Sequence, residues 1–228
     1  MDIWTLIQDG QFEEACRIAD NEYVETKNIL LLRNKVYALF HLKKYEEAFK
    51  LGNKIIEINK GKSDVDFVFS GIALWLLNRK KEAIERWGNT EETHFKDAGG
   101  GIDIQILLFF ASIKTSEKQL EVDVLKVLKK LLKSKKNLSW PAPLGAFLLG
   151  EITESDLYSR IVNIPILRER QLCQAHFVVG IKELERENIS GYLKNLADCI
   201  SYGPSAYLEQ FYYLAKGEIE SKAVNSQL

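Results

Sequence analysis

A short pattern occurs three times in the first 90 residues, as GQFEEACRIA, KKYEEAFKLG and RKKEAIERW. Aligning the three copies places Ala15, Ala48 and Ala83 in register, 33 and then 35 residues apart. Phe12 and Tyr45 stand three positions before the first two alanines. A period of about 34 residues is typical of helix–turn–helix units that stack on one another, so this recurrence constrains the fold more than any other feature.

The stretch FVFSGIALWLLNRKKEAIERW, residues 67 to 87, gives the clearest view of one such unit. Phe67, Gly71 and Leu74 are spaced at i, i+4 and i+7, which is one stripe of a helix, and Ala83 with Trp87 forms a matching stripe after a short break. Small residues let two backbones approach closely. The stretch predicts two short helices packed against each other, as in an interaction scaffold.

Composition is that of an ordinary soluble, globular and mainly helical protein. Of the 228 residues, 46% are hydrophobic and 28% are charged, and only four are proline. The formal net charge is −1, which disfavours a nucleic-acid partner. No run approaches the roughly 18 apolar residues needed to span a bilayer. The N-terminus lacks the basic and apolar regions of a signal peptide, so we expect a cytoplasmic protein without membrane contact.

The recurring pattern resembles the tetratricopeptide family, which has a small residue within helix A, an aromatic residue opening helix B and an alanine three residues later. Residues 171 to 204 repeat the pattern at full length, with Ala175, Gly180, Ile189, Cys199 and Pro204 at family positions. The resemblance implies an all-α fold, a right-handed α-α superhelix of helical hairpins with a divergent middle section. We expect one domain, 1–228, with repeats at about 1–28, 29–62 and 63–95, divergent hairpins at about 96–170, a repeat at about 171–204 and a capping helix at about 205–220.

Several local signals place helix ends. The run KDAGGG, residues 96 to 101, indicates a tight helix entry or a close approach of backbones. Residues 102 to 114 predict a helix buried on most faces, with a strand as the alternative for the first six residues. Helix is expected from near Pro143 to about Gly150. Three side-chain caps are predicted, namely Ser63 with Asp66, Ser116 with Gln119, and Thr153 with Asp156.

One helix is rich in lysine. Val127, Leu128, Leu131 and Leu132 are interleaved with Lys126, Lys129, Lys130, Lys133, Lys135 and Lys136. The apolar residues fall at helical spacing, which favours an amphipathic helix with a solvated basic face over a phosphate-binding face.

No pattern indicates catalysis, so we expect a non-enzyme without cofactor or metal. His41, His94 and His176 lie far apart, and none stands at zinc-ligand spacing with another histidine or a cysteine. Nucleophile-elbow, dinucleotide and phosphate-loop signatures do not occur. Cys16, Cys173 and Cys199 are odd in number and lie in apolar helical patterns, which indicates reduced core thiols.

The segments DAGGGIDIQILLFFASIK and WPAPLGAFLLGEITESDL, with the C-terminal repeat, also resemble a subgroup of small bacterial tetratricopeptide-like proteins encoded beside polymorphic, contact-dependent toxins. That resemblance implies an immunity protein whose partner is a toxin domain. The alternatives are a general adapter or co-chaperone and, further away, an RNA-associated helical repeat using the lysine-rich helix.

The tetratricopeptide resemblance also implies which residues face a protein partner. In that family helix A lines the concave face, and the corresponding residues here are Arg33, Tyr37, His41, Ile72, Trp75 and Arg79. Aromatic and arginine side chains often anchor interfaces because they bury a large area and keep a polar group. The alternative for Tyr37 and Trp75 is that they only close the stack against the next repeat.

Overall fold

The computed structural model describes residues 2–90, 93–98, 100–133 and 139–225. Within these ranges all regular structure is helical, apart from one isolated bridge between Ser63 and Phe95. This confirms the all-α prediction. The chain divides into two compact units, Met1–Phe95 and Lys96–Leu228, which are described separately below. None of the helices in the described part of the chain is both long and apolar enough to cross a membrane.

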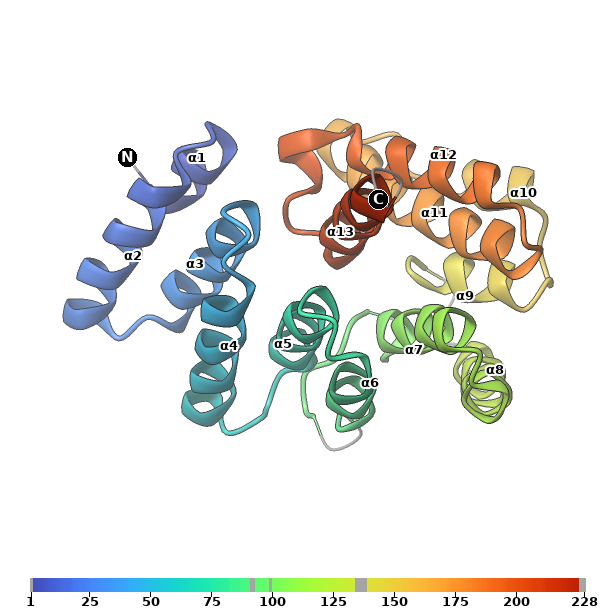
Figure 1. Ribbon diagram of the computed structural model, residues 1–228, viewed down its shortest axis with the longest axis horizontal. Coiled ribbons are helices and arrows are strands. Elements are labelled where there is room, and N and C mark those ends of the chain that lie inside the picture. Colours follow the sequence, from blue (N-terminus) through green and yellow to red (C-terminus); the bar gives the residue numbers. More distant parts are fainter. Residues whose placement is uncertain (1, 91–92, 99, 134–138, 226–228) are drawn as a thin grey trace. The chain divides into compact units, whose positions relative to one another are not determined.

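The first unit is a series of helices in which each packs against the next (Figure 1). Its elements are α1 Ile3–Gln8, α2 Phe12–Thr26, α3 Ile29–His41, α4 Tyr45–Asn59, α5 Asp64–Leu76 and α6 Lys80–Gly88. Besides sequence neighbours, α1 contacts α3 and α3 contacts α5. The first helices of successive hairpins therefore touch, which brings side chains of α3 and α5 together.

The recurring alanines occupy the helix crossings that the sequence predicts. Ala15, Ala48 and Ala83 are 0%, 1% and 0% exposed. Phe12 and Tyr45 are the first residues of α2 and α4, as the aromatic positions predicted. Because each alanine has only a methyl group, the second helix of each hairpin can lie close against its neighbours.

The predicted caps have mixed outcomes. Thr153 and Asp156 form the expected capping box. The prediction for Ser63 and Asp66 was wrong, because Ser63 makes no side-chain cap and the Asp66 carboxylate instead accepts hydrogen bonds from Arg33 and Asn59. The prediction for Ser116 and Gln119 was also wrong.

The reason for the second failure lies in the backbone at Ser116. This residue has a φ of 59° and ends α7, and Glu117 takes the position before α8 without a side-chain cap. The amide of Gln119 instead donates to the Asp123 carboxylate at 2.8 Å.

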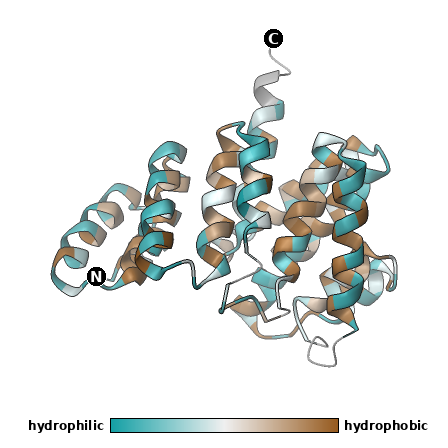
Figure 2. Ribbon diagram, turned by 90° about the horizontal axis from the view of Figure 1, so that it is seen from below, coloured by the Kyte–Doolittle hydropathy of each residue, from teal (hydrophilic) through white to brown (hydrophobic). Residues whose placement is uncertain are grey.

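The second unit is arranged around α11, which packs against α7, α9, α10, α12 and α13. Its elements are α7 Ile102–Thr115, α8 Lys118–Leu132, α9 Ala142–Leu148, α10 Glu154–Ser159, α11 Pro165–Glu185, α12 Ile189–Ile200, the 3₁₀ helix η1 Gly203–Ala206 and α13 Gln210–Asn225. The expected capping helix thus begins at Gln210 rather than Ser205, after a separate turn around Pro204. In Figure 2 the hydrophobic residues gather where the helices of a unit face each other.

The glycine run before α7 is a helix entry, as expected. Gly101 precedes the helix with a φ of 107°, a conformation that favours glycine. The Asp97 carboxylate accepts hydrogen bonds from the backbone N–H groups of Gly101 and Asp103 at 3.0 and 2.8 Å. The helix begins at Ile102, so the strand alternative was wrong, and most of its residues are buried as predicted.

Two buried carboxylates tie the helices of the second unit together. Glu209, before α13, accepts hydrogen bonds from Arg170 and Gln174 of α11. Glu218 of α13 pairs with Lys114 of α7 and accepts a hydrogen bond of 3.0 Å from the hydroxyl of Tyr192 on α12. Because charges inside a protein are costly unless they are paired, these contacts specify how the helices dock.

Candidate protein-binding surface

The residues predicted to face a partner all lie on the first unit. Arg33, Tyr37 and His41 belong to α3, Ile72 and Trp75 belong to α5, and Arg79 directly precedes α6. Ile72 and Trp75 are 0% and 4% exposed. Their contacts are therefore those of packing residues, while the charged groups of Arg33 and Arg79 are partly exposed.

Arg33 joins α3 to α5 through an ion pair with two parallel hydrogen bonds. Its Nε and Nη2 atoms donate to the two Asp66 carboxylate oxygens at 2.7 and 2.9 Å, and Asn59 Nδ2 donates to the same carboxylate at 2.9 Å. The hydrogen bond to Asp66 raises the pKa of the Arg33 guanidinium. A paired arginine of this kind fixes geometry, and it is less available to an incoming carboxylate than a free one.

A small cleft opens beside this ion pair, with room for about one water molecule. It lies among α3, α4 and α5 and is lined by Arg33, Val36, Tyr37, Gly52, Ile55, Val65, Asp66 and Phe69. Its walls are mostly apolar with one polar edge, and it is smaller than a side chain of a partner, so it does not by itself define a binding pocket. The cleft includes two of the residues predicted from the sequence, Arg33 and Tyr37.

Tyr37 and His41 take part in aromatic contacts within the unit. The Tyr37 ring lies edge-on to Trp4 and Phe69, with centroid distances of 6.2 and 5.0 Å. The His41 ring stacks on Phe12, with centroids 4.3 Å apart and planes 1° from parallel. These rings connect α1, α2, α3 and α5. The interpretation that Tyr37 closes the stack accounts for its contacts, and a role in partner binding stays a prediction.

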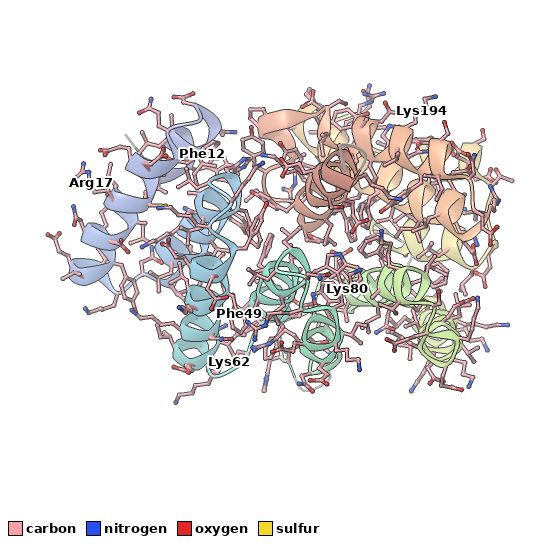
Figure 3. The ribbon with its side chains drawn as sticks, in the orientation of Figure 1. Phe12, Arg17, Phe49, Lys62, Lys80 and Lys194 are labelled. Carbon is pink, nitrogen blue, oxygen red and sulfur yellow. The ribbon has the colours of Figure 1, made fainter. Side chains whose placement is uncertain are left out.

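A second group on α4 and α6, which we call the Phe49 cluster, consists of Glu46, Phe49, Arg79, Glu82 and Arg86. The guanidinium carbons of Arg79 and Arg86 lie 4.8 and 5.8 Å from the centre of the Phe49 ring, within the range of cation–π attraction. Phe49 lies between α4 and α6 (Figure 3). The two arginines thus hold an aromatic ring between helices of successive hairpins.

Carboxylates complete the Phe49 cluster. Arg79 Nε donates to Glu82 at 2.7 Å, and Arg79 Nη1 lies 3.8 Å from the Glu46 carboxylate. The hydrogen bond to Glu82 raises the pKa of Arg79, whereas partial burial lowers the pKa of Arg86. Arg86 therefore has a partly desolvated guanidinium, and among the described residues no carboxylate lies as close to it as Glu82 lies to Arg79. This suits Arg86 to meet an acidic or carbonyl group of a partner.

The sequence reasoning missed Phe49 and Arg86. A signal was present, because Phe49 directly follows the register alanine Ala48, and Arg79, Glu82 and Arg86 stand at i, i+3 and i+7. The sequence carried no signal for the contact between two hairpins that brings these residues together.

The lysine-rich helix lies on the second unit as α8. Leu128 is fully buried and Lys126, Lys129 and Lys130 are exposed, as the amphipathic pattern predicts, whereas Val127, expected among the apolar residues, is 40% exposed. Lys126 pairs with Asp123 at 3.3 Å. Lys135 and Lys136 lie outside the described residues.

His176 on α11 is half-buried in a polar group rather than in an apolar core. Its Nδ1 lies 3.1 Å from the Tyr158 hydroxyl and 3.4 Å from Asn195 Oδ1, and its Nε2 lies 3.2 Å from the Tyr202 hydroxyl. Burial raises the pKa values of both tyrosines, so they remain neutral, and since a neutral imidazole has a single N–H, only one of the two hydroxyls can donate to the ring. Over the described ranges, no group of three or more histidine, cysteine or acidic side chains is placed to hold a metal ion.

Comparisons with known proteins add no assignment, since no family model and no curated protein matches the chain.

Proposed function

We propose that the chain is a non-catalytic, protein-binding module built as a right-handed, tetratricopeptide-like superhelix, and that it acts as a cytoplasmic immunity protein. Its partner in this proposal is a bacterial toxin domain, which it neutralises by occupying a surface of that domain. Neutralisation of this kind requires one bound copy per toxin and no turnover.

The Phe49 cluster is the observation that carries the proposal. Arginine and aromatic residues dominate the energetics of protein interfaces, and here two arginines and one phenylalanine are already positioned by their neighbours. Pre-positioned side chains lose less conformational entropy when a partner binds. The net charge of −1 gives little long-range attraction, so the interface depends on local charge complementarity around this desolvated group.

A co-chaperone that grips a C-terminal carboxylate fits these contacts less well. Such a protein needs basic side chains free to bind the ligand. Arg33 and Arg79 are each held by a carboxylate of the chain, through two hydrogen bonds with Asp66 and with Glu82 respectively. An incoming carboxylate would have to displace these partners, at a cost in free energy.

The proposal expects the gene immediately upstream to encode a large secreted protein that ends in a toxin domain, and the experiment is a calorimetric titration of this chain with that purified domain. We expect 1:1 binding and a loss of affinity of about tenfold or more for Arg86→Ala, equivalent to about 1.4 kcal/mol or more. Arg17→Ala is the matched control, because Arg17 is an exposed arginine of the same unit (Figure 3) that pairs with Glu14 of its own helix.

Equal affinities for wild type, Arg86→Ala and Arg17→Ala would show that the toxin domain does not bind at the Phe49 cluster. Absence of binding by the wild-type chain to that toxin domain would contradict the proposed function itself.

A further inference from the structure

Helices α11 and α12 form an antiparallel hairpin with a well-defined register. His176 Nδ1 lies 3.4 Å from Asn195 Oδ1, and a Cβ atom added at Gly180 would lie 3.3 Å from the Asn195 Cβ. The same register places Cys173 opposite Cys199, with their sulfur atoms 3.3 Å apart. Two of the three cysteines in the chain are therefore in direct contact across this hairpin.

Both thiols are reduced and fully buried, at 0% exposure. Burial raises the pKa of the Cys173 thiol well above its ordinary value. The third cysteine, Cys16, belongs to α2 in the first unit and is partly exposed. The contact between Cys173 and Cys199 is thus a property of the α11–α12 hairpin.

We infer that Cys173 and Cys199 are a site of intrachain disulfide formation that cross-links α11 to α12 when the chain meets a low-molecular-weight disulfide as oxidant. A disulfide bond is about 2.0 Å long, so the sulfur atoms need to approach by about 1.3 Å. The hairpin already supplies the proximity, and the remaining movement is small compared with the length of the side chains.

The reaction balances without any other reactant. The thiolate of one cysteine attacks the oxidant R–S–S–R, giving a mixed disulfide and one released thiolate, R–S⁻. The second cysteine thiolate then attacks the protein sulfur of the mixed disulfide and releases the second R–S⁻. The two cysteines are oxidised by two electrons, the small disulfide is reduced to two R–SH, and these take up the two protons that the cysteines lost.

Burial determines when this exchange can occur. The thiolate is the reactive form, and the raised pKa of Cys173 keeps its population low in the folded chain. We therefore expect rapid cross-linking while α11 and α12 are assembling or open, and slow exchange once the hairpin has closed. The same burial then protects the finished disulfide from external reductant.

The test is to refold the full chain in a buffer containing glutathione disulfide, so that access to the buried thiols does not limit the reaction. We expect an intact mass lower by about 2 Da, one free thiol in denaturant instead of three, and a Cys173–Cys199 cross-linked peptide after proteolysis. Cys16→Ala should behave in the same way and retain no free thiol. Cys173→Ala and Cys199→Ala should lose the cross-link.

Two further readouts separate a native cross-link from a non-native one. Because the cross-link closes a loop across 26 positions, the Tm of the oxidised chain should rise by several degrees over that of the reduced chain. Reduction by dithiothreitol should be at least about tenfold slower in native buffer than in urea. Three remaining free thiols, a persistent glutathione adduct on either cysteine, or a cross-linked chain with a lower Tm would overturn the inference.

Discussion

Gly71 lies directly beneath the indole ring of Trp87, and no larger residue fits there. A Cβ atom added at Gly71 would come within 2.2 Å of the Trp87 Nε1 atom. The indole cannot easily move away, because it is fully buried and its N–H donates to the backbone carbonyl of Val68 at 3.1 Å. This contact sets the closest approach of α5 and α6.

Gly71→Ala should therefore destabilise the chain by about 3 kcal/mol or more, despite the better helix propensity of alanine. Gly88→Ala is the matched control, because Gly88 is the last residue of α6 and a Cβ there would meet nothing within 4 Å. Urea unfolding followed by tryptophan fluorescence measures both. Equal stability of the two variants would show that α5 and α6 do not pack through Gly71.

The repeating sequence pattern predicted where neighbouring helices cross. Ala83 of the recurring pattern and Gly71 of the stretch 67 to 87 both identify a helix crossing, because a close crossing tolerates only small side chains. The ion pair between Arg33 and Asp66 was not predictable in this way, since the repeat period aligns equivalent positions of two hairpins without indicating which side chains pair. Asp66 also fits a local capping pattern, which competed with the long-range partner and led to the wrong interpretation.

The sequence predicted only part of the candidate protein-binding surface, because the residues of this surface come together through packing between hairpins. The prediction of Arg79 as a helix-A position was wrong, because Arg79 lies in the turn directly before α6, and Phe49 and Arg86 belong to the second helices of two hairpins. Their contact depends on how one hairpin packs on the next.

Ser70 has a buried hydroxyl that finds no hydrogen-bond partner among the described residues. Ser70→Ala removes this unsatisfied group and should be neutral or stabilise the chain by up to about 1 kcal/mol. Ser112→Ala is the control, because the Ser112 hydroxyl is equally buried but donates to the Phe109 carbonyl at 2.8 Å, so its loss should cost about 1 kcal/mol. The free energy of unfolding is measured by thermal or urea unfolding. A larger decrease for Ser70→Ala than for Ser112→Ala would contradict this account.

Arg170 compensates the buried charge of Glu209, so its removal should have a pH-dependent cost. Burial raises the pKa of Glu209, and Arg170 opposes this effect. Arg170→Met should destabilise the chain by about 2 kcal/mol at pH 8, less than for a fully buried pair because Arg170 is partly exposed. Arg168→Met, which changes an exposed arginine two residues earlier on the same helix, should have little effect.

The sign of the pH dependence follows from the raised pKa. In folded Arg170→Met, Glu209 stays protonated at pH values at which it is ionised in the unfolded chain. The folded state therefore gains stability as the pH falls towards the pKa that Glu209 has in the unfolded chain. The difference in stability between wild type and Arg170→Met should therefore be smaller at pH 5.5 than at pH 8. A difference that stays constant or grows at pH 5.5 in urea titrations would show that Glu209 does not carry the effect.

The exposed lysines of α8 distinguish the protein-binding proposal from an RNA-associated helical repeat. We expect no binding of a fluorescent single-stranded RNA of about 20 nucleotides at 0.15 M salt, measured by anisotropy. Binding that weakens steeply with salt and disappears when Lys126, Lys129 and Lys130 are changed to glutamate would favour the RNA-associated alternative.

The most direct test of the central claim is a growth measurement in bacteria that express the upstream toxin domain with and without this chain. The account predicts that wild type restores growth fully, that Arg17→Ala does so equally, and that Arg86→Ala, with its fold confirmed by circular dichroism, restores growth poorly. Continued killing in the presence of the well-expressed, folded wild-type chain would contradict it.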